Sequence, residues 1–219
     1  MDSRLPVFES VLVVCAHPDD ESFGLGAILS TLADAGSRLS VLCFTHGGAS
    51  TLHTASGDLG AIRATELAAA GEVLGIIRVE LLDYPDGALN AQPLDELADH
   101  VLRIAREVDP SILLVFDHGG ITGHPDHQRA TSVALHAAAT LGLRVLAWAI
   151  PGKLADLLNG EFGTAFAGRD DNELDIAVTV DRTRQLDAIR LHRSQSTDNP
   201  VLWRRLDLLG SAEYLRYLG

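Results

Sequence analysis

Short, continuous apolar runs alternating with longer amphipathic stretches constrain the fold of this chain more than any other feature. Five such runs are predicted strands: residues 10–16, 39–45, 77–82, 111–116 and 144–150. Four stretches with apolar residues at helical spacing are predicted helices: residues 21–35, 58–74, 94–108 and 125–141. Strands that are apolar on both faces are typical of covered parallel sheets. The alternation therefore predicts a Rossmann-like α/β fold, a mostly parallel sheet with helices on both faces.

The remaining third of the chain follows the same pattern more loosely. Residues 175–180 form one more predicted strand, at an edge of the sheet, and a helix is predicted to follow over 181–192. Apolar side chains in the last residues indicate that the tail packs on the body of the protein. We expect one domain over residues 1–219, with a core of about 8–150 and a C-terminal extension of about 151–219.

Composition excludes several classes of protein. The chain of 219 residues is 47% hydrophobic and carries a formal net charge of −13. Such an acidic chain repels phosphate backbones and anionic membrane surfaces, so nucleic acid is not an expected partner. No apolar run approaches the length of a membrane span, and no signal peptide is recognisable. With only Cys15 and Cys43, both expected to be buried and reduced, the sequence predicts a cytoplasmic protein.

A bias toward one basic residue points to the source of the chain. Sixteen arginines stand against a single lysine, beside abundant alanine and glycine. This usage is typical of translation from a GC-rich genome, which favours a bacterial origin.

Two similar tetrads follow the first and fourth predicted strands. They read HPDD at residues 17–20 and HPDH at 124–127. Each proline is suited to the first turn of a helix, and residues three apart would then lie one helical turn from each other. Ligands of doubly wound sheets bind at the carboxyl ends of strands, where the strand order reverses. If the first and fourth strands are neighbours, both tetrads lie at that crevice.

The combined tetrads offer a metal site. His17, Asp20 and His127 form a set of two histidines and one aspartate that leaves a fourth position free. Catalytic zinc takes three protein ligands of this kind and activates a water molecule at the open position. Fe²⁺ accepts the same ligands, so the sequence predicts Zn²⁺ with Fe²⁺ as the alternative.

The other tetrad residues suit acid–base chemistry. Asp19 need not bind the metal and can act as general base for the water molecule. His124 can stabilise an oxyanion or protonate a leaving group, with Asp126 orienting it. Each residue alone has a simpler interpretation as a helix cap or first-turn carboxylate, which the helix dipole favours. The pairing of two tetrads, each after an apolar strand, is what favours a catalytic centre.

A glycine pair after the first strand offers a weak alternative. Gly24 and Gly26 match part of a phosphate-binding loop, but the third glycine is missing and the preceding acids would repel a pyrophosphate. We therefore expect no nucleotide cofactor.

At these residues the chain resembles the LmbE-like (PIG-L) family of zinc-dependent de-N-acetylases. The resemblance rests on AHPDDE at 16–21 and HPDH at 124–127, supported by IRATEL at 62–67, YPDG at 84–87 and HxSQ at 192–195. It implies a Rossmann-like fold with the metal at the carboxyl ends of the strands. It also implies removal of the N-acetyl group from a glucosamine-type sugar conjugate.

The resemblance implies roles for individual residues. The three expected ligands match the family's zinc ligands, Asp19 its general base, His124 the histidine that assists the tetrahedral intermediate, and Asp126 the partner of this histidine. Arg63 matches an arginine that contacts the sugar or inositol part of substrates in some members, and Asp86 is a second candidate for substrate binding. The alternatives are a surface charge on a helix for Arg63 and a turn residue for Asp86.

Three hypotheses follow. The favoured one is a zinc-dependent amidohydrolase whose small-molecule partner is an N-acetylated amino-sugar conjugate. The second is an iron oxygenase, because two histidines and one carboxylate also form its facial triad. The third is a metal-binding or sugar-binding module without catalysis, against which the intact Asp19 and His124 argue. The acidic surface and apolar tail also permit a homo-oligomer.

Overall fold

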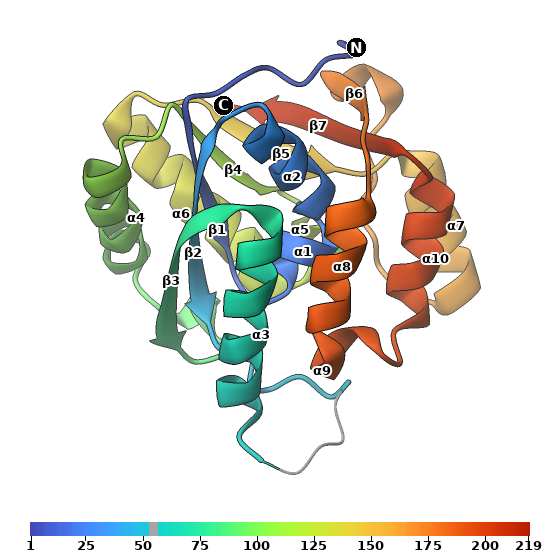
Figure 1. The fold of residues 1–219 in the computed structure, drawn as a ribbon, viewed down its shortest axis with the longest axis horizontal. Helices are drawn as coiled ribbons and strands as arrows, with labels where there is room; N and C mark the ends of the chain where they lie inside the picture. The colour runs from blue at the N-terminus through green and yellow to red at the C-terminus, as the bar shows by residue number, and fades with distance from the viewer. Residues whose placement is uncertain (53–56) are drawn as a thin grey trace.

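A seven-stranded sheet organises the computed structural model, which describes residues 1–52 and 57–219 (Figure 1). The strand order is β3-β2-β1-β4-β5-β7-β6. The strands are β1 Ser10–Cys15, β2 Arg38–Thr45, β3 Ile76–Tyr84, β4 Ile112–Phe116, β5 Val145–Ala149, β6 Ile176–Thr179 and β7 Ala212–Leu218. The first five are mutually parallel, and β7 runs antiparallel to both of its neighbours. The predicted fold class is therefore confirmed.

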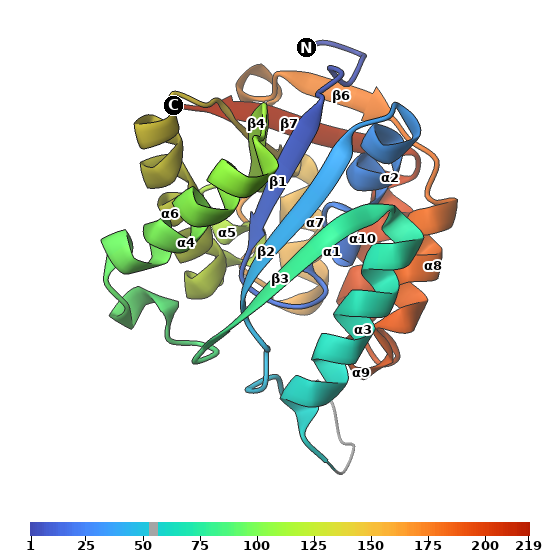
Figure 2. The same ribbon diagram turned by 60° about the vertical axis from the view of Figure 1, so that its left-hand side comes forward.

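Helices cover both faces of the sheet, as Figures 1 and 2 show. One face carries α4 Leu94–Val108 and α6 Pro125–Leu141, and the other carries α2 Gly26–Asp34, α3 Leu59–Leu74 and α8 Thr183–Leu191. Alternate residues of β1 divide between the two layers. Leu12 and Val14 belong to the apolar core under α4 and α6, whereas Val11 and Val13 belong to the core on the opposite face. This explains why β1 is apolar at every position after Ser10.

The predicted helix over residues 21–35 is wrong in one respect, because it is interrupted. It forms the short helix α1, Asp20–Phe23, and then α2. A Cβ atom on Gly24 would lie 2.5 Å from Cε1 of Phe116, so the backbone passes closely over this ring between the two helices. A side chain at position 24 would collide with this ring, so the close approach requires glycine.

The C-terminal extension completes the same sheet. The chain forms α7 Gly152–Phe162, η2 Asp171–Glu173, β6, α8, α9 Arg193–Ser196, α10 Pro200–Leu209 and β7. The expected edge position of β6 is confirmed. The sequence does not predict the last strand, β7, in which buried residues mostly alternate with half-buried ones. It inserts between β5 and β6, and Glu213 on it accepts a hydrogen bond of 2.6 Å from Trp148 Nε1 of β5.

Two further expectations concern burial and membranes. Cys15 and Cys43 lie side by side on β1 and β2, and both are buried free thiols without a disulfide bond. Within residues 1–52 and 57–219, no helix has the length and apolar character required to cross a membrane.

Candidate active site and metal centre

The two tetrads meet where the strand order reverses. β1 and β4 are parallel neighbours, so their carboxyl ends lie at the same edge of the sheet. His17 follows β1 after a single residue, and the second tetrad follows β4 after the short helix α5, Gly120–Gly123. Residues more than 100 positions apart in the sequence are thereby brought together.

Three side chains from the two tetrads converge. His17 Nδ1 lies 3.0 Å from His127 Nε2, and His127 Nε2 lies 3.1 Å from Asp20 Oδ1. His17 Nδ1 and Asp20 Oδ2 are 4.0 Å apart. Two imidazole nitrogens and a carboxylate at these separations form a donor set that suits zinc or ferrous iron. The three residues predicted as ligands could therefore hold one metal ion.

Backbone contacts fix two of these donors. Asp20 Oδ2 accepts hydrogen bonds from the N–H groups of Ala16 and His17, at 3.0 and 2.9 Å. His127 Nδ1 lies 3.0 Å from the Gly120 carbonyl oxygen. Because the Gly120 carbonyl oxygen can only accept, this contact puts a proton on Nδ1, and Nε2, which faces His17 and Asp20, is the nitrogen available to a metal ion.

Two carboxylates lie on the other side of the His17 ring. His17 Nε2 is 3.0 Å from Asp86 Oδ1 and 3.4 Å from Asp126 Oδ2. Burial alone would lower the pKa of His17, but its contacts with Asp126 and Asp86 outweigh burial and raise the pKa to about 10. The surroundings thus favour positive charge at this ring, which is the electrostatic setting of a metal ligand backed by carboxylates.

The sequence makes Asp86 a candidate for substrate binding, and the structure places it against His17. Its Oδ1 faces His17, and its Oδ2 accepts a hydrogen bond of 2.8 Å from the Ala49 N–H. The close contact with His17 holds the pKa of Asp86 at about 2, so the group is ionised. Asp86 lines the cleft, but both of its oxygens already have partners within the protein. It is placed to orient His17.

The local structure of the first tetrad differs from the prediction. We expect both aspartates to lie in a first helical turn, but α1 begins at Asp20 and Asp19 lies outside it. Asp19 has φ 120°, a conformation that residues with a side chain rarely adopt. Its N–H donates a hydrogen bond of 2.9 Å to Glu21 Oε2. This strained backbone separates the Asp19 carboxylate from the carboxylate of Asp20.

Arg63 holds the Asp19 carboxylate from the opposite side. Its Nη2 donates to Asp19 Oδ2 at 2.9 Å and to the Pro18 carbonyl at 2.5 Å, and its Nη1 donates to the Gly47 carbonyl at 2.6 Å. Arg63 is buried, so the alternative of a surface charge is wrong. Although it lines the cleft, its guanidinium is committed to the first tetrad, which makes it a partner of Asp19.

Burial governs the protonation of Asp19. Burial raises the pKa of its carboxyl to about 6, against the opposing attraction of Arg63. Asp20 behaves differently, because the charges of His127 and His17 outweigh burial and hold its pKa well below the usual range. The two adjacent aspartates thus differ in proton affinity, as expected for one base and one ligand.

A buried pair beneath the first tetrad was not predicted as part of the site. Glu21 and His192 are both fully buried, and Glu21 Oε1 lies 2.6 Å from His192 Nε2. Burial alone would lower the pKa of His192, but the charge of Glu21 raises it. Both residues belong to motifs on which the family resemblance rests, AHPDDE and HxSQ. Their contact spans 171 positions, so no local spacing could have indicated it.

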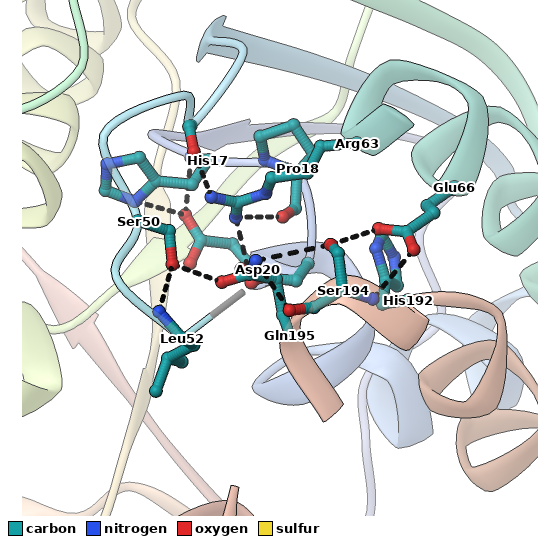
Figure 3. Close-up of polar contacts among 12 residues, drawn as sticks. His17, Pro18, Asp20, Ser50, Leu52, Arg63, Glu66, His192, Ser194 and Gln195 are labelled. Atoms are coloured by element: carbon teal, nitrogen blue, oxygen red, sulfur yellow. Dashed lines mark hydrogen bonds and ion pairs between the residues drawn. The ribbon is translucent and has the colours of Figure 1, made fainter. Parts of the chain in front are cut away.

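The rest of the HxSQ segment ties the C-terminal region to the site (Figure 3). Ser194 donates to Glu66 of α3 through its N–H and hydroxyl, at 2.8 and 2.6 Å. Gln195 Nε2 donates to the Ser194 carbonyl at 2.9 Å, and its Oε1 accepts from Ser50 Oγ at 2.6 Å. A connected set of hydrogen bonds therefore joins the loop after β2 to α3 beside the first tetrad.

The second tetrad forms an ordinary helix start. Pro125 is the first residue of α6, and His124 caps it by accepting a hydrogen bond of 3.2 Å from the Asp126 N–H through Nδ1. The expectation that the Asp126 carboxylate orients His124 is wrong, because this carboxylate points to the YPDG loop. It accepts from the N–H groups of Gly87 and Leu89, at 2.8 and 3.1 Å.

His124 is the third histidine of the site. Ligand atoms of His17, His124 and His127 lie within 4.8 Å of one another. Burial lowers the pKa of His124, so its imidazole is neutral. Because its Nδ1 is an acceptor, the proton resides on Nε2, which can serve as a hydrogen-bond donor.

A cleft of about 550 Å³ opens onto these groups. Asp19, Asp20 and the three histidines lie along it. The remaining lining is mostly apolar and includes Phe23, Phe116, Trp148, Phe166 and Leu202. A volume of this size accommodates a small-molecule substrate.

Comparison with known proteins provides independent information. Residues 12–138 match the PIG-L family model, described as GlcNAc-PI de-N-acetylase. The chain is 32% identical to a 1D-myo-inositol 2-acetamido-2-deoxy-α-D-glucopyranoside deacetylase from Salinispora arenicola, over 88% of this chain and 78% of that protein. It is 29% identical to the protein of the same name from Kineococcus radiotolerans, over 89% and 71%.

Solved structures share the fold. A deacetylase of the teicoplanin biosynthesis pathway matches with a TM-score of 0.73 and 20% identity, over 95% of this chain and 97% of that one. The N,N'-diacetylchitobiose deacetylase of Pyrococcus horikoshii matches with a TM-score of 0.69 and 24% identity, over 96% of this chain and 84% of that one. A 4-carboxy-2-hydroxymuconate hydratase from Pseudomonas putida matches with 0.72 and 18%, over 96% of each chain. The fold therefore hosts more than one reaction, and sequence similarity carries more functional weight.

Proposed function

Because this chain belongs to the PIG-L family, whose model is described as GlcNAc-PI de-N-acetylase, we propose that it is a metal-dependent hydrolase that removes the N-acetyl group from a glucosamine-type sugar conjugate. The observation that carries the proposal is the convergence of two imidazoles and one carboxylate beside a second, separately held carboxylate. The metal ligands are His17, Asp20 and His127, and the second carboxylate belongs to Asp19.

The donor set fits a metal ion. Nδ1 of His127 contacts the Gly120 carbonyl, so Nε2 is the nitrogen that can bind a metal ion, Asp20 is ionised, and the carboxylates behind His17 stabilise positive charge at this position. We propose Zn²⁺ as the resident ion, because two histidines, one carboxylate and an open side toward a cleft are the pattern of catalytic zinc. A bound divalent ion polarises the amide carbonyl and makes a water molecule more acidic.

Asp19 is the proposed general base. Arg63 fixes one carboxylate oxygen, and the Asp19–Glu21 hydrogen bond fixes the backbone, so the carboxylate has a defined direction. With a pKa of about 6, the group is ionised at neutral pH and still basic enough to accept a proton. After accepting the proton from water, Asp19 can deliver it to the departing amine nitrogen.

His124 is the proposed oxyanion partner. Its neutral imidazole carries the proton on Nε2, while Nδ1 is held by the N-terminus of α6. An Nε2–H group beside the cleft can donate to the amide oxygen as negative charge develops there. Asp126 contributes indirectly, because its carboxylate fixes the YPDG loop and lies against His17.

The substrate is proposed from the relatives and the cleft. The two named relatives act on an N-acetylated glucosamine joined to inositol. For this chain we propose an N-acetylated amino sugar as the substrate and do not specify the group attached to it. A cleft of about 550 Å³ holds a sugar with a further substituent.

The test is release of free amine from a panel of N-acetylglucosamine conjugates by protein of measured metal content. The expected result is release that disappears with a chelator and returns with Zn²⁺. Asp19→Asn at the same metal content serves as the inactive control. No release from any conjugate at full metal loading would contradict the proposal and favour the binding module, and oxygen-dependent turnover with Fe²⁺ would favour the oxygenase.

A further inference from the structure

A buried arginine from α10 forms part of the cleft. Arg205 is 7% exposed and lines the cleft together with Trp148 and Phe23. Its Nη2 donates a hydrogen bond of 2.6 Å to the Phe23 carbonyl, and its guanidinium carbon lies 5.1 Å from the centre of the Trp148 ring. This positive charge has no part in the hydrolysis proposed above.

The charge of Arg205 has no anionic partner among the residues that the structure describes. Its Nε is buried without a hydrogen-bond acceptor. The acid that attracts it most, Glu213, already accepts hydrogen bonds from Arg182 and from Trp148 Nε1. Two arginines thus share one buried carboxylate, and this cluster keeps one uncompensated positive charge.

An unpaired buried charge calls for a ligand. Burial lowers the pKa of Arg205 to about 10, so the guanidinium stays protonated at neutral pH. A buried ion without a counter-ion is costly to the folded protein, whereas an arriving anion removes that cost. The planar donors of arginine match carboxylate and phosphate oxygens.

Aromatic rings connect this charge to the metal centre. The Trp148 ring centre lies 5.3 Å from that of Phe116, which in turn lies 5.0 Å from that of His127. Arg205 is therefore separated from a proposed ligand by two apolar rings that line the same cleft. A substrate whose amide lies at His127 can reach the guanidinium with a substituent that passes these rings.

We propose that Arg205 binds an anionic group carried by the substrate, at the end of the aromatic wall of the cleft. This inference rests on the proposed function and specifies its substrate: an N-acylated amino-sugar conjugate with a carboxylate or phosphate. The anion can be attached through the glycosidic oxygen or through the acyl group. The two attachments present the same chemistry to Arg205.

The test uses two matched probe pairs that place a carboxylate at either position. One pair is the propyl and 2-carboxyethyl glycosides of N-acetylglucosamine, and the other is N-butanoyl-glucosamine and N-succinyl-glucosamine. The kcat/KM of each probe is measured with zinc-loaded wild type, Arg205→Met and Arg204→Met. We expect wild type to prefer the charged member of one pair at least tenfold, and Arg205→Met to reduce this ratio to about one.

Arg204 is the matched control. It is the neighbouring arginine of α10, lies outside the cleft lining, and pairs at the surface with Glu161 and Asp207. Its substitution should leave the preference intact. If no probe is hydrolysed, the proposed function fails, and calorimetric binding of the same pairs tests Arg205 separately. Two results would overturn the proposal: equal rates or affinities within both pairs for wild type, or an undiminished preference in Arg205→Met. Arg205 would then have only a structural role, through its contacts with Phe23 and Trp148.

Discussion

The two tetrads share their first three residues but form different structures. HPDH is the start of the 17-residue helix α6, with proline in the first turn and a histidine cap. HPDD leads into the four-residue helix α1, and Asp19 adopts φ 120°. The second tetrad is held by helix geometry and a neighbouring loop. The first is held by buried charges from α3 and from the C-terminal region, Arg63 and His192.

This difference separates two tasks. A regular helix start is sufficient to present His127 and His124 to the cleft, because capping and first-turn geometry fix both side chains. Holding two adjacent aspartates in different directions, one toward His127 and one toward Arg63, requires a strained backbone and compensating contacts. The proposed base lies in the strained tetrad, where positioning depends on the most distant parts of the chain.

The largest effect is expected from removing the proposed ligand of the second tetrad. His127→Ala takes away the Nε2 that faces both His17 and Asp20, so retained metal and amine release should both fall below detection. His124→Ala is the matched control from the same tetrad, and we expect it to keep its metal while losing rate. Metal analysis after dialysis distinguishes them, and equal metal retention by the two variants would argue against the ligand assignment.

The next largest effect is expected in the network under the first tetrad. Glu21→Ala leaves His192 buried without its carboxylate partner and removes the acceptor of the Asp19 N–H. The free energy of unfolding should therefore fall by about 3–5 kcal/mol. Glu21→Gln keeps an acceptor and should lose less stability. Urea denaturation of metal-free protein measures both variants. A Glu21→Ala variant as stable as wild type would show that the pair does not support this tetrad.

A smaller effect is expected for the carboxylate of the second tetrad. Asp126→Asn keeps one acceptor oxygen for the YPDG loop but removes the negative charge 3.4 Å from His17 Nε2. Metal affinity should weaken about 10–100-fold, the range for groups that orient a ligand. Competition with a chromophoric chelator measures this change. Unaltered metal affinity with slower turnover would instead favour a direct catalytic role for Asp126.

The smallest effect is expected at the glycines that follow β2. A Cβ atom on Gly47 would collide with Nη1 of Arg63, and Gly47 has φ +63°. Gly47→Ala should therefore displace the partner of Asp19 and destabilise the fold by about 1–2 kcal/mol. Among the residues that the structure describes, a Cβ atom on the adjacent Gly48 would contact nothing within 4 Å beyond its chain neighbours, so Gly48→Ala is the control. Equal thermal stability and turnover of the two variants would contradict the role given to Arg63.

Local sequence patterns predict much of this structure. Apolar runs predict the five parallel strands, and the tetrads predict which side chains meet at the switch point, because helix starts and strand ends are local features. Contacts over long separations are beyond such patterns. Glu21 with His192, Glu66 with Ser194, and the burial of Arg63 depend on how α3 and the C-terminal helices pack.

Two incorrect predictions have the same cause. The prediction that Asp19 lies in a first helical turn is wrong because the buried charges around it override the local preference. The prediction that the Asp126 carboxylate faces His124 is wrong because the N–H groups of the YPDG loop attract it. In both cases tertiary hydrogen bonds determine the direction of a side chain that its neighbours in sequence leave undecided.

The most direct test of the central claim is the turnover and metal content of Asp19→Asn, measured across pH beside wild type. Wild-type kcat/KM should rise as pH increases through about 6, because the base acts only when its carboxyl has lost its proton. Asp19→Asn should keep its metal, lose about 10²–10⁴-fold in kcat and lose this acidic limb. Near-normal turnover at unchanged metal content, with the acidic limb preserved, would contradict the assignment of Asp19 as the base.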